Sequence, residues 1–420
     1  MSKVVIIGNG IAGITAARHI RKDSDHEIVV ISAESKYFFS RTALMYIYMG
    51  HMKFEHTQPY ENWFWNKNNI QLVQAYVTKI ESDKKHILLQ SGEVIPYDKL
   101  ILALGSKPRE MPLDGINLLG VQSLYSKQDL YLMEINTEGV KQAVVVGGGL
   151  IGIEMAEMLH SRGIHVTLVV REDSYWNMVL PAEESQMVNR HIISRGIDLK
   201  LSQTVSEIIG DTKIERVILD DKSILNCQFL GITIGVDANI DFLKNSEIET
   251  NRGILVDDNL QTNIEDIYAI GDCVELQNPP EGRRAMEPVW YTGRIMGETV
   301  AANICHGPRK YEPGIWFNSA KFFDLEYQTY GFVPSSPQDG YDSFYWEDKK
   351  SERSIRIVLN TDKTVVGIVS MGIRIRHEVC ENWIESGKTL DYALSHLADI
   401  DFDPELCRKF EKEVATSNPV

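Results

Sequence analysis

The sequence contains the same glycine-rich motif twice, and this repeat constrains the fold more than any other feature. The two copies are GNGIAG, with Gly8, Gly10 and Gly13, and GGGLIG, with Gly147, Gly149 and Gly152. Each copy follows a short apolar run and precedes small and apolar residues at helical spacing. A strand, a glycine turn and a helix in this order form the βαβ unit that binds a dinucleotide. Two copies therefore predict two bound dinucleotides in one chain.

The three glycines of each motif have different tasks. The first turns the chain, the second lets the backbone approach a pyrophosphate, and the third packs the helix on the strand. Backbone N–H groups at the helix start then hold the anion together with the helix dipole. The residues expected to present these groups are Ile11, Ala12, Leu150 and Ile151.

Composition narrows the classes of protein that the chain can belong to. The 420 residues suffice for two or three domains, and 43% hydrophobic with 24% charged residues is ordinary for a globular protein. A net charge of −16 argues against nucleic acid and anionic membranes as partners. No apolar stretch reaches the roughly 20 residues of a membrane span, and a strand from Lys3 leaves no room for a signal peptide. We expect a cytoplasmic protein.

The cysteines do not form a recognisable pattern. They are odd in number and show neither CxxC nor zinc-ligand spacing: Cys227, Cys273, Cys305, Cys380 and Cys407. We therefore expect neither a disulfide framework nor a metal site.

Hydrophobic periodicity predicts alternating strands and helices, followed by a stretch of aromatic, alternating segments. The expected strands are 4–7, 27–31, 97–105, 143–146, 165–170, 204–209, 214–219 and 229–235, and the expected helices are 12–20, 151–159, 182–195 and 290–304. A loop is expected at 236–240, and an apolar strand with an acidic turn at 262–275. From Tyr311 the sequence predicts antiparallel strands at 354–359 and 364–370 and a helix at 376–386.

Four motifs, in this order, resemble those of the pyridine nucleotide-disulfide oxidoreductases, flavoproteins that bind two dinucleotides. They are GNGIAG, LILALGSKPR, VVVGGGLIGIEMAE and TNIEDIYAIGDC. The resemblance implies FAD and NADH or NADPH as cofactors. It also implies an α/β fold with two Rossmann-like dinucleotide-binding domains, of which the FAD domain is interrupted, and a C-terminal α+β domain. The expected segments are 1–112 and 240–310 for FAD, 113–239 for NAD(P)H, and 311–420 for an interface or docking domain.

The resemblance also implies roles for single residues. Glu34 lies about 20 residues past the first glycines, where a carboxylate accepts the ribose hydroxyls of adenosine. Asp272 would lie at the ribityl chain or phosphates of FAD, and Glu154 would lie close to the nicotinamide and flavin. Trp290 would stand at the flavin, so Glu154 and Trp290 are the candidate catalytic residues. Small residues in the other turns would border the cofactors: Ala103, Gly105, Gly235 and Gly271.

The sequence departs from its disulfide-reducing relatives after Glu34. Those proteins carry one or two cysteines in the stretch that here reads YFFSRTALMYIYMG, and no cysteine precedes Cys227. Without a thiolate, disulfide exchange and peroxide chemistry lose their nucleophile. The chain thus resembles the thiol-less branch: ferredoxin and rubredoxin reductases, the flavin portion of nitrite reductase, and apoptosis-inducing factor. In this branch Arg41 would lie near the FAD phosphates or the flavin edge, while Tyr46 replaces a lysine that would pair with Glu154.

The choice between NADH and NADPH depends on the end of the strand 165–170. An acid there accepts the ribose hydroxyls of NADH, whereas arginine accepts the phosphate of NADPH. Arg171 favours NADPH, although the carboxylates of Glu172 and Asp173 would repel a phosphate.

Three hypotheses follow for the electron acceptor. The first is a small electron-transfer protein such as a ferredoxin or rubredoxin. The second is a small molecule such as oxygen, a quinone or, through a partner, nitrite, and the third is a redox-responsive binding protein with little turnover. Such acceptor proteins are usually acidic, so docking needs local positive charge. The candidates are Arg283, Arg284, Arg374, Arg376 and His377. A homodimer is compatible with the last domain.

Overall fold

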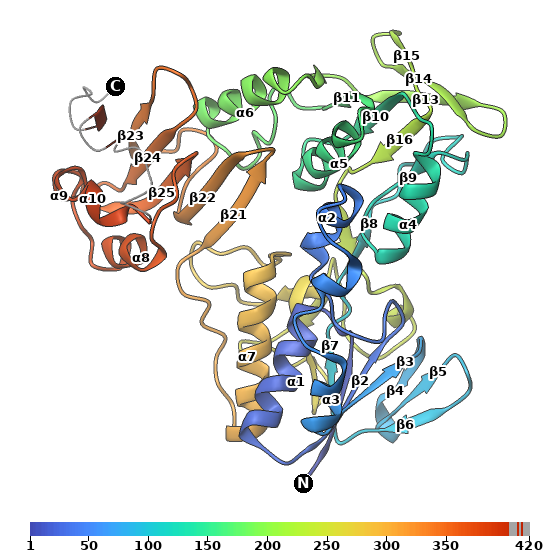
Figure 1. Ribbon diagram of the computed structural model, residues 1–420. Helices are drawn as coiled ribbons and strands as arrows, with labels where there is room; N and C mark the ends of the chain where they lie inside the picture. The colour runs from blue at the N-terminus through green and yellow to red at the C-terminus, as the bar shows by residue number, and fades with distance from the viewer. Residues whose placement is uncertain (403–409, 411–412, 415–420) are drawn as a thin grey trace. The chain divides into compact units, whose positions relative to one another are not determined.

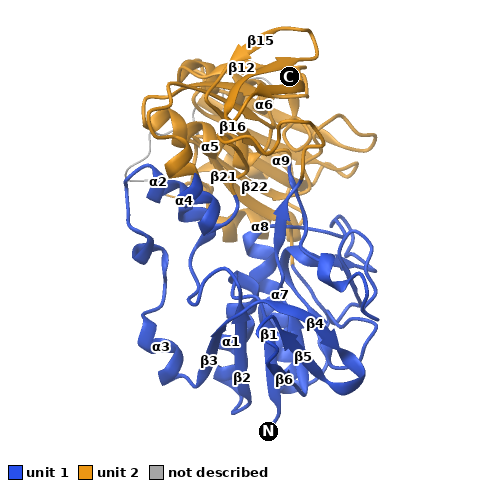
Figure 2. Ribbon diagram, turned by 90° about the vertical axis from the view of Figure 1, so that its right-hand side faces the viewer, with its two compact units in different colours: residues 1–109, 125–132, 235–313 blue, residues 110–124, 133–234, 314–420 orange. Residues whose placement is uncertain are grey.

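The computed structural model describes residues 1–402, 410, 413 and 414. These residues divide into two compact units, drawn in different colours in Figure 2. Unit 1 comprises residues 1–109, 125–132 and 235–313, and unit 2 comprises 110–124, 133–234 and 314–420. Each glycine motif lies in a different unit, the first in unit 1 and the second in unit 2.

Unit 1 is built on a five-stranded parallel sheet with the order β19-β7-β1-β2-β3. Its strands are β19 (Ile267–Ala269), β7 (Lys99–Leu102), β1 (Lys3–Ile7), β2 (Glu27–Ser32) and β3 (Ile70–Gln74). The central strands are continuous runs of valine, isoleucine and leucine with almost no exposed surface. Such runs are typical of a parallel sheet that is covered on both faces.

Two long helices pack closely in unit 1. Helix α1 (Ile11–Asp23) follows the first glycine motif and lies side by side with α7 (Trp290–His306), as Figure 1 shows. A β-carbon added to Gly297 of α7 would lie 2.6 Å from the backbone oxygen of Ala12. The glycine thus allows the two helix backbones to approach, which fixes α7 beside the first glycine turn.

The rest of unit 1 consists of small sheets and short helices. The remaining strands pair as β4-β5-β6, β8-β17 and β18-β20. Their bounds are β4 (Val77–Glu81), β5 (His86–Leu89), β6 (Val94–Pro96), β8 (Ser106–Pro108), β17 (Val236–Ala238), β18 (Ile254–Val256) and β20 (Val274–Leu276). The short helices are α2 (Leu44–Tyr48) and α3 (Asn62–Lys67).

Unit 2 repeats the dinucleotide-binding architecture around the second motif. Its parallel sheet has the order β12-β11-β10-β16-β9, with helix α5 (Leu150–Ser161) after the glycines and α6 (Ala182–Ser194) further along. The strands are β12 (Asp198–Lys200), β11 (His165–Val169), β10 (Gln142–Val146), β16 (Phe229–Ile232) and β9 (Val121–Gln122). An antiparallel sheet packs on this core through apolar side chains: β13 (Val205–Gly210), β14 (Ile214–Leu219) and β15 (Ile224–Asn226).

The C-terminal part of unit 2 is an antiparallel sheet with the order β21-β22-β25-β24-β23. Its strands are β21 (Phe317–Phe322), β22 (Leu325–Gly331), β23 (Asp342–Glu347), β24 (Ser354–Leu359) and β25 (Val365–Met371). Its helices are α8 (His377–Glu385), α9 (Leu390–Ser395) and α10 (Leu397–Ile400). Every residue of β24 is buried, so this strand is covered on both faces. Residues of α8, α9 and α10 cover one face through a shared apolar core.

The predicted α/β fold with two dinucleotide-binding cores and a C-terminal α+β part is confirmed. The predicted loop at 236–240 is wrong in part, because Val236–Ala238 forms β17 and pairs with β8. Helix α4 (Lys127–Asn136) was not predicted, and its residues fall in both units. The two compact units do not follow the four predicted segments, whose boundaries stay a prediction.

The residues that the structure describes contain neither a candidate membrane span nor a candidate metal cluster. Within them no helix is both long and apolar enough to cross a membrane. No group of three or more histidine, cysteine or acidic side chains in the described part could hold a metal ion. Cys407 lies outside the described residues.

Candidate functional site

The first glycine motif forms a tight turn beside an open space. Gly8 has φ +113°, and a β-carbon on it would lie 2.0 Å from the backbone oxygen of Ala103. A β-carbon on Gly13 would lie 2.1 Å from the oxygen of Gly8, so the start of α1 is pressed against the turn. Gly10 has no atom within 4 Å of its β-carbon position. The motif therefore leaves room for a ligand at Gly10, where α1 begins with Ile11.

The second motif has the same geometry in unit 2. Gly147 has φ +130°, and its β-carbon position lies 2.2 Å from the backbone oxygen of Thr233. A β-carbon on Gly152 would lie 2.5 Å from the oxygen of Gly147, and that of Gly149 meets nothing within 4 Å. Leu150 and Ile151 begin α5 at this open side. Each loop is thus a cradle with the tight first turn, the open second glycine and the closely packed third glycine of a pyrophosphate-binding motif.

Glu34 and Arg41 form an ion pair in unit 1. Arg41 Nη1 donates to Glu34 Oε1 at 3.0 Å, and the backbone N–H of Lys127 donates to the same oxygen at 2.9 Å. The guanidinium of Arg41 also lies 4.6 Å from the ring centroid of Tyr125 and donates to its backbone oxygen at 2.6 Å. Arg41 therefore stands at the carboxylate that was predicted to accept the ribose.

Asp272 lies in the short turn after β19, beside Gly271. Gly271 has φ +80°, and its β-carbon position is 3.0 Å from the side chain of Ala12. The turn therefore lies against the start of α1. Ser106 Oγ donates to Asp272 Oδ2 at 3.1 Å. Burial raises the pKa of Asp272, since its charged form loses hydration there, while the Ser106 hydrogen bond and Arg41 act in the opposite direction.

Glu154 lies in unit 2, one turn into α5. Burial raises its pKa to about 7, with a further contribution from the negative charge of Glu157, while the nearby Lys321 lowers it. A carboxyl group with a pKa near neutrality exchanges a proton easily at physiological pH, which makes Glu154 a candidate for proton chemistry.

The end of β11 carries Glu172 close to the second glycine loop. Glu172 Oε2 lies 3.6 Å from the β-carbon position of Gly148, and the side chain is 22% exposed. Arg171 is 78% exposed and donates through Nη2 to Glu172 Oε1 at 2.7 Å. The carboxylate, and not the predicted arginine, is therefore the group that lies against the loop.

Three other predicted site residues have different surroundings. Trp290 is the first residue of α7, is 38% exposed, and has its ring 5.4 Å from that of Tyr291. Gly235 falls in unit 1, where its backbone oxygen accepts a hydrogen bond from the N–H of Arg109 at 3.0 Å. Gly105 has φ +68° and lies 3.6 Å, at its β-carbon position, from the hydroxyl of Tyr125.

Sequence reasoning missed three side chains that lie at the glycine turns. Tyr125 accepts a hydrogen bond from the N–H of Ser106 at its hydroxyl, 3.1 Å away. Thr233 donates to the oxygen of Val146 at 2.8 Å, next to Gly147. The buried Tyr175 donates to the oxygen of Gly149 at 2.6 Å. None of them belongs to a motif, and Thr233 lies inside the predicted strand 229–235, whereas in the structure β16 ends at Ile232 and Thr233 follows it.

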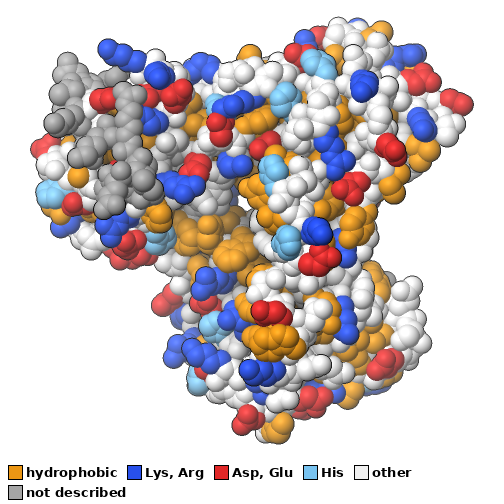
Figure 3. All heavy atoms as spheres, in the orientation of Figure 1, with side chains coloured by type: hydrophobic (Ala, Val, Ile, Leu, Met, Phe, Trp, Pro, Cys, Tyr) orange, Lys and Arg blue, Asp and Glu red, His pale blue; other side chains and the backbone are white. Residues whose placement is uncertain are grey.

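Three arginines among the five predicted basic docking residues are paired with carboxylates of the chain itself. Arg283 and Glu287 form an ion pair in which the side chains are 7% and 4% exposed, so the prediction of a docking role for Arg283 is wrong. In unit 2, Arg374 pairs with Glu326 and Arg376 with Glu378. On the face drawn in Figure 3, basic and acidic side chains are interspersed.

The described cysteines are unsuited to electron relay. Cys227, Cys273 and Cys380 are buried, and burial raises the pKa of each thiol, to about 12 for Cys227 and Cys273. Cys305 is half-buried, and burial raises its pKa too. Since the thiolate is the reactive form, none of these four groups is activated as a nucleophile.

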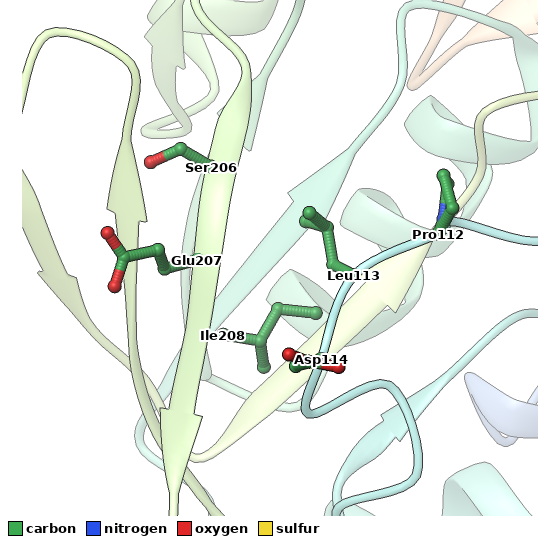
Figure 4. Close-up of a pocket in the computed structure, with 6 residues that line it drawn as sticks. All are labelled: Pro112, Leu113, Asp114, Ser206, Glu207 and Ile208. Carbon is green, nitrogen blue, oxygen red and sulfur yellow. The ribbon is translucent and has the colours of Figure 1, made fainter.

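A pocket of about 340 Å³ lies elsewhere in unit 2. Figure 4 shows its lining, which comes from the segment before β9 and from β13: Pro112, Leu113, Asp114, Ser206, Glu207 and Ile208. The lining includes two carboxylates and no residue of the second glycine motif. This pocket is therefore a different site from the dinucleotide cradle of unit 2.

The paired cradles, each on a parallel sheet, define an oxidoreductase that binds two dinucleotides. Residues 2–301 match the pyridine nucleotide-disulphide oxidoreductase family. The chain belongs to this family, and it is an FAD-dependent NAD(P)H oxidoreductase. The open sides of Gly10 and Gly149, each at a helix start, fit the pyrophosphates of these two cofactors.

Individual relatives agree with this assignment. An NADH oxidase of Methanocaldococcus jannaschii is 31% identical over 77% of this chain and 75% of its own length. A rubredoxin-NAD(+) reductase of Acinetobacter baylyi is 29% identical over 73% of this chain and 80% of its own length. A nitrite reductase [NAD(P)H] of Bacillus subtilis is 30% identical over 88% of this chain, which spans only 45% of that longer protein. A ferredoxin reductase of Rhodopseudomonas palustris shares the fold, with a TM-score of 0.82 at 23% identity over 88% of this chain and 91% of that one.

Proposed function

We propose that this protein takes hydride from NADH and passes the electrons, through FAD, to a small rubredoxin- or ferredoxin-like protein without using a thiol. The observation that carries the proposal is the combination of two dinucleotide cradles with four described cysteines whose thiol pKa values are raised by burial. When bound, FAD supplies an acceptor of a hydride that can release electrons singly or in pairs. The Acinetobacter relative is named for rubredoxin and supports this choice of acceptor.

Unit 1 would hold FAD through backbone and carboxylate groups. The first motif, with Gly8, Gly10, Ile11, Ala12 and Gly13, would receive the pyrophosphate, because Gly10 borders open space at the start of α1. Glu34 would accept the ribose hydroxyls, with Arg41 holding its carboxylate in place. Asp272 would accept a hydroxyl of the ribityl chain, oriented by Ser106. FAD would also be bordered by three small residues, which leave room for it: Ala103, Gly105 and Gly271.

Unit 2 would hold the nicotinamide nucleotide. The second motif, with Gly147, Gly149, Leu150, Ile151 and Gly152, would receive the pyrophosphate, and Glu154 would lie at the nicotinamide end. Thr233 and Tyr175 would keep the loop in shape through their hydrogen bonds to Val146 and Gly149. A contribution of Gly235 to this site stays a prediction.

We infer that NADH is preferred to NADPH. Glu172 lies against Gly148, where a carboxylate can accept two ribose hydroxyls and would repel a 2′-phosphate. Arg171 donates to this same carboxylate and is mostly exposed, so its predicted role as a phosphate anchor has little support. The names of the Methanocaldococcus and Acinetobacter relatives, which specify NADH and NAD(+), agree with this preference.

Without a thiol between flavin and acceptor, the acceptor must approach the flavin directly. Trp290, partly exposed at the first turn of α7, would be the aromatic group nearest to this exit. Its ring could shield the flavin and contact the acceptor, since aromatic side chains serve both packing and interfaces.

The test is anaerobic stopped-flow mixing of the FAD-loaded protein with NADH, followed by rubredoxin or ferredoxin. We expect bleaching of the flavin absorbance within seconds and its recovery when the acceptor protein is added. Flavin reduction over minutes with a long-lived charge-transfer band would instead favour the binding-protein hypothesis. Fast reduction with recovery only on admission of air would identify oxygen as acceptor, a second candidate that the name of the Methanocaldococcus relative favours.

A cytoplasmic location and a homodimer belong to the same proposal. Cell fractionation with a cytoplasmic marker tests the location, and light scattering of the FAD-loaded protein tests the dimer. A monomeric mass would remove the dimer from the proposal without affecting the electron-transfer role.

A further inference from the structure

Glu154 belongs to a cluster of three charged side chains in unit 2. Glu157 lies on the same helix, α5, at the i+3 position, so it faces the same side as Glu154. Lys321 comes from β21 of the C-terminal sheet, and its Nζ lies 3.7 Å from Glu157 Oε1. β21 packs against α5, so the chain brings this ammonium group to the helix from a segment more than 150 residues away.

The surroundings of the cluster make its charges effective. Ile153 and Met155, on either side of Glu154, are fully buried, and the side chain of Glu157 is only 13% exposed. The charge of Glu157 is poorly screened by water in this place, whereas the side chain of Lys321 is 36% exposed and its charge is partly screened. Both neighbours still change the free energy of ionising Glu154. Glu157 favours the protonated form of Glu154 and raises its pKa, whereas Lys321 favours the carboxylate and lowers it.

We propose that Lys321 is a positioning residue that, opposed by Glu157, sets the protonation of Glu154 and thereby links the C-terminal sheet to the reaction at the nicotinamide site. This inference rests on the proposed function of Glu154 at the nicotinamide. The consequence is a rate of flavin reduction that changes with pH near neutrality.

The other ionisable groups near α5 lie further away, are buried, or have partners of their own. On α5, His160 lies further along the helix and contacts the ring of Phe323. Tyr175, from the loop after β11, is buried and has its pKa raised. Glu326 stands opposite Lys321 on β22 and is paired with Arg374. Beneath α5, β10 and β16 contribute no ionisable residue, and His165 of β11 lies at the far end and pairs with Asp198.

The test uses two variants whose effects must have opposite signs. Lys321→Met should move the midpoint of the pH profile of flavin reduction by NADH to higher pH, by roughly half a unit or more. Glu157→Gln should move the midpoint to lower pH by a similar amount. Lys321→Arg should restore the parental midpoint. Lys363→Met removes another ion pair of the C-terminal domain, between exposed side chains, and serves as the matched control with no shift.

A second measurement does not depend on activity. Glu154 has a folded-state pKa of about 7, above the value of 4.5 for the unfolded chain. Between pH 4.5 and about 7 the carboxyl group of Glu154 is ionised in the unfolded chain but still protonated in the folded protein. The free energy of unfolding therefore falls as pH rises through this range, and not beyond it. The difference in Tm between Glu154→Gln and the parent should grow over this range and then level off. In the Lys321→Met background it should level off at higher pH, and in the Glu157→Gln background at lower pH.

The outcomes separate the two proposals. Shifts in the same direction, or no shift in folded Lys321→Met and Glu157→Gln proteins, would overturn the role of Lys321. Opposite shifts of the Tm difference together with a pH-independent rate of flavin reduction would support the cluster but refute the role of Glu154 at the nicotinamide.

Discussion

At the scale of single residues, Gly8 and Gly10 have different functions although they lie two positions apart. Gly8 is required by the fold, because its φ of +113° and the contact with Ala103 exclude a side chain. Gly10 has an extended backbone and open space around its β-carbon position, so the fold tolerates a methyl group there. The space beside Gly10 serves the ligand, and the two positions therefore separate folding from binding.

Alanine substitutions at these two glycines should give distinct results. Gly8→Ala should lower the free energy of unfolding of the FAD-free protein by roughly 2–4 kcal/mol, from backbone strain and the clash with Ala103. Gly10→Ala should cost less than about 1 kcal/mol, as for other helix N-caps, but should lower the FAD content of purified protein. Urea unfolding and the ratio of absorbance at 450 and 280 nm, roughly the flavin and protein maxima, measure the two effects. A Gly10→Ala protein with full FAD content would contradict the assignment of the cradle.

The position of Glu172 allows the preference for NADH over NADPH to be tested with one substitution, Glu172→Gln. Glu172→Gln removes the charge that faces a 2′-phosphate and weakens acceptance of the ribose hydroxyls. The ratio of kcat/KM for NADH to that for NADPH should fall by about tenfold, corresponding to about 1.4 kcal/mol. Asp173→Asn is the matched control, because Asp173 is the next residue, is exposed, and accepts a hydrogen bond from Asn177. An unchanged ratio in Glu172→Gln would return the preference to Arg171.

At the scale of elements, one buried arginine joins the two halves of unit 2. Arg356 of β24 donates to both carboxylate oxygens of Glu184 on α6, at 2.8 and 3.0 Å, and to Glu183 at 2.7 Å. Its guanidinium also lies 4.6 Å from the ring centroid of Tyr345. Glu184 is fully buried, so its charge depends on Arg356 for compensation.

Breaking this ion pair should destabilise the protein strongly. Arg356→Met leaves Glu184 buried without its partner, and we expect a loss of about 3–5 kcal/mol of unfolding free energy. Arg356→Met combined with Glu184→Leu should recover most of this loss, because two apolar groups need no compensation. Arg376→Met, which breaks the exposed pair with Glu378, should cost less than about 1 kcal/mol. Denaturant unfolding compares the four proteins, and a double variant as unstable as the single one would contradict the explanation.

Elements with a clear hydrophobic period could be predicted from the sequence. The sequence predicted four helices to within a few residues: α1, α5, α6 and α7. Their apolar patterns extend over several helical turns. The two glycine turns were predicted from their motifs. β17 was missed, because its three residues form a strand only through pairing with β8, which lies far away in the sequence. Contacts made by single side chains, such as Tyr125 at Ser106 and Lys321 at Glu157, follow from the packing of distant segments and leave no local signal.

At the scale of the whole molecule, negative charge exceeds positive charge, and among the described residues drawn in Figure 3 basic and acidic side chains are interspersed. The net charge is −16, and several candidate docking residues are already neutralised by Glu287, Glu326 and Glu378. An acidic acceptor protein is therefore repelled at long range, whatever contacts it makes once it has arrived. Association by this protein should thus lack the electrostatic steering that the sequence alone suggested.

The dependence of turnover on salt tests this conclusion. Between about 0.01 and 0.15 M ionic strength the Debye length falls from about 30 to 8 Å, which screens long-range repulsion. The kcat/KM for an acidic rubredoxin or ferredoxin should therefore stay constant or rise with salt, whereas steered association would make it fall steeply. The rate of flavin reduction by NADH, measured without acceptor at each ionic strength, is the control for effects of salt on that step itself. A steep fall with the protein acceptor alone would show that a local basic surface, assembled from residues other than the paired arginines, governs docking.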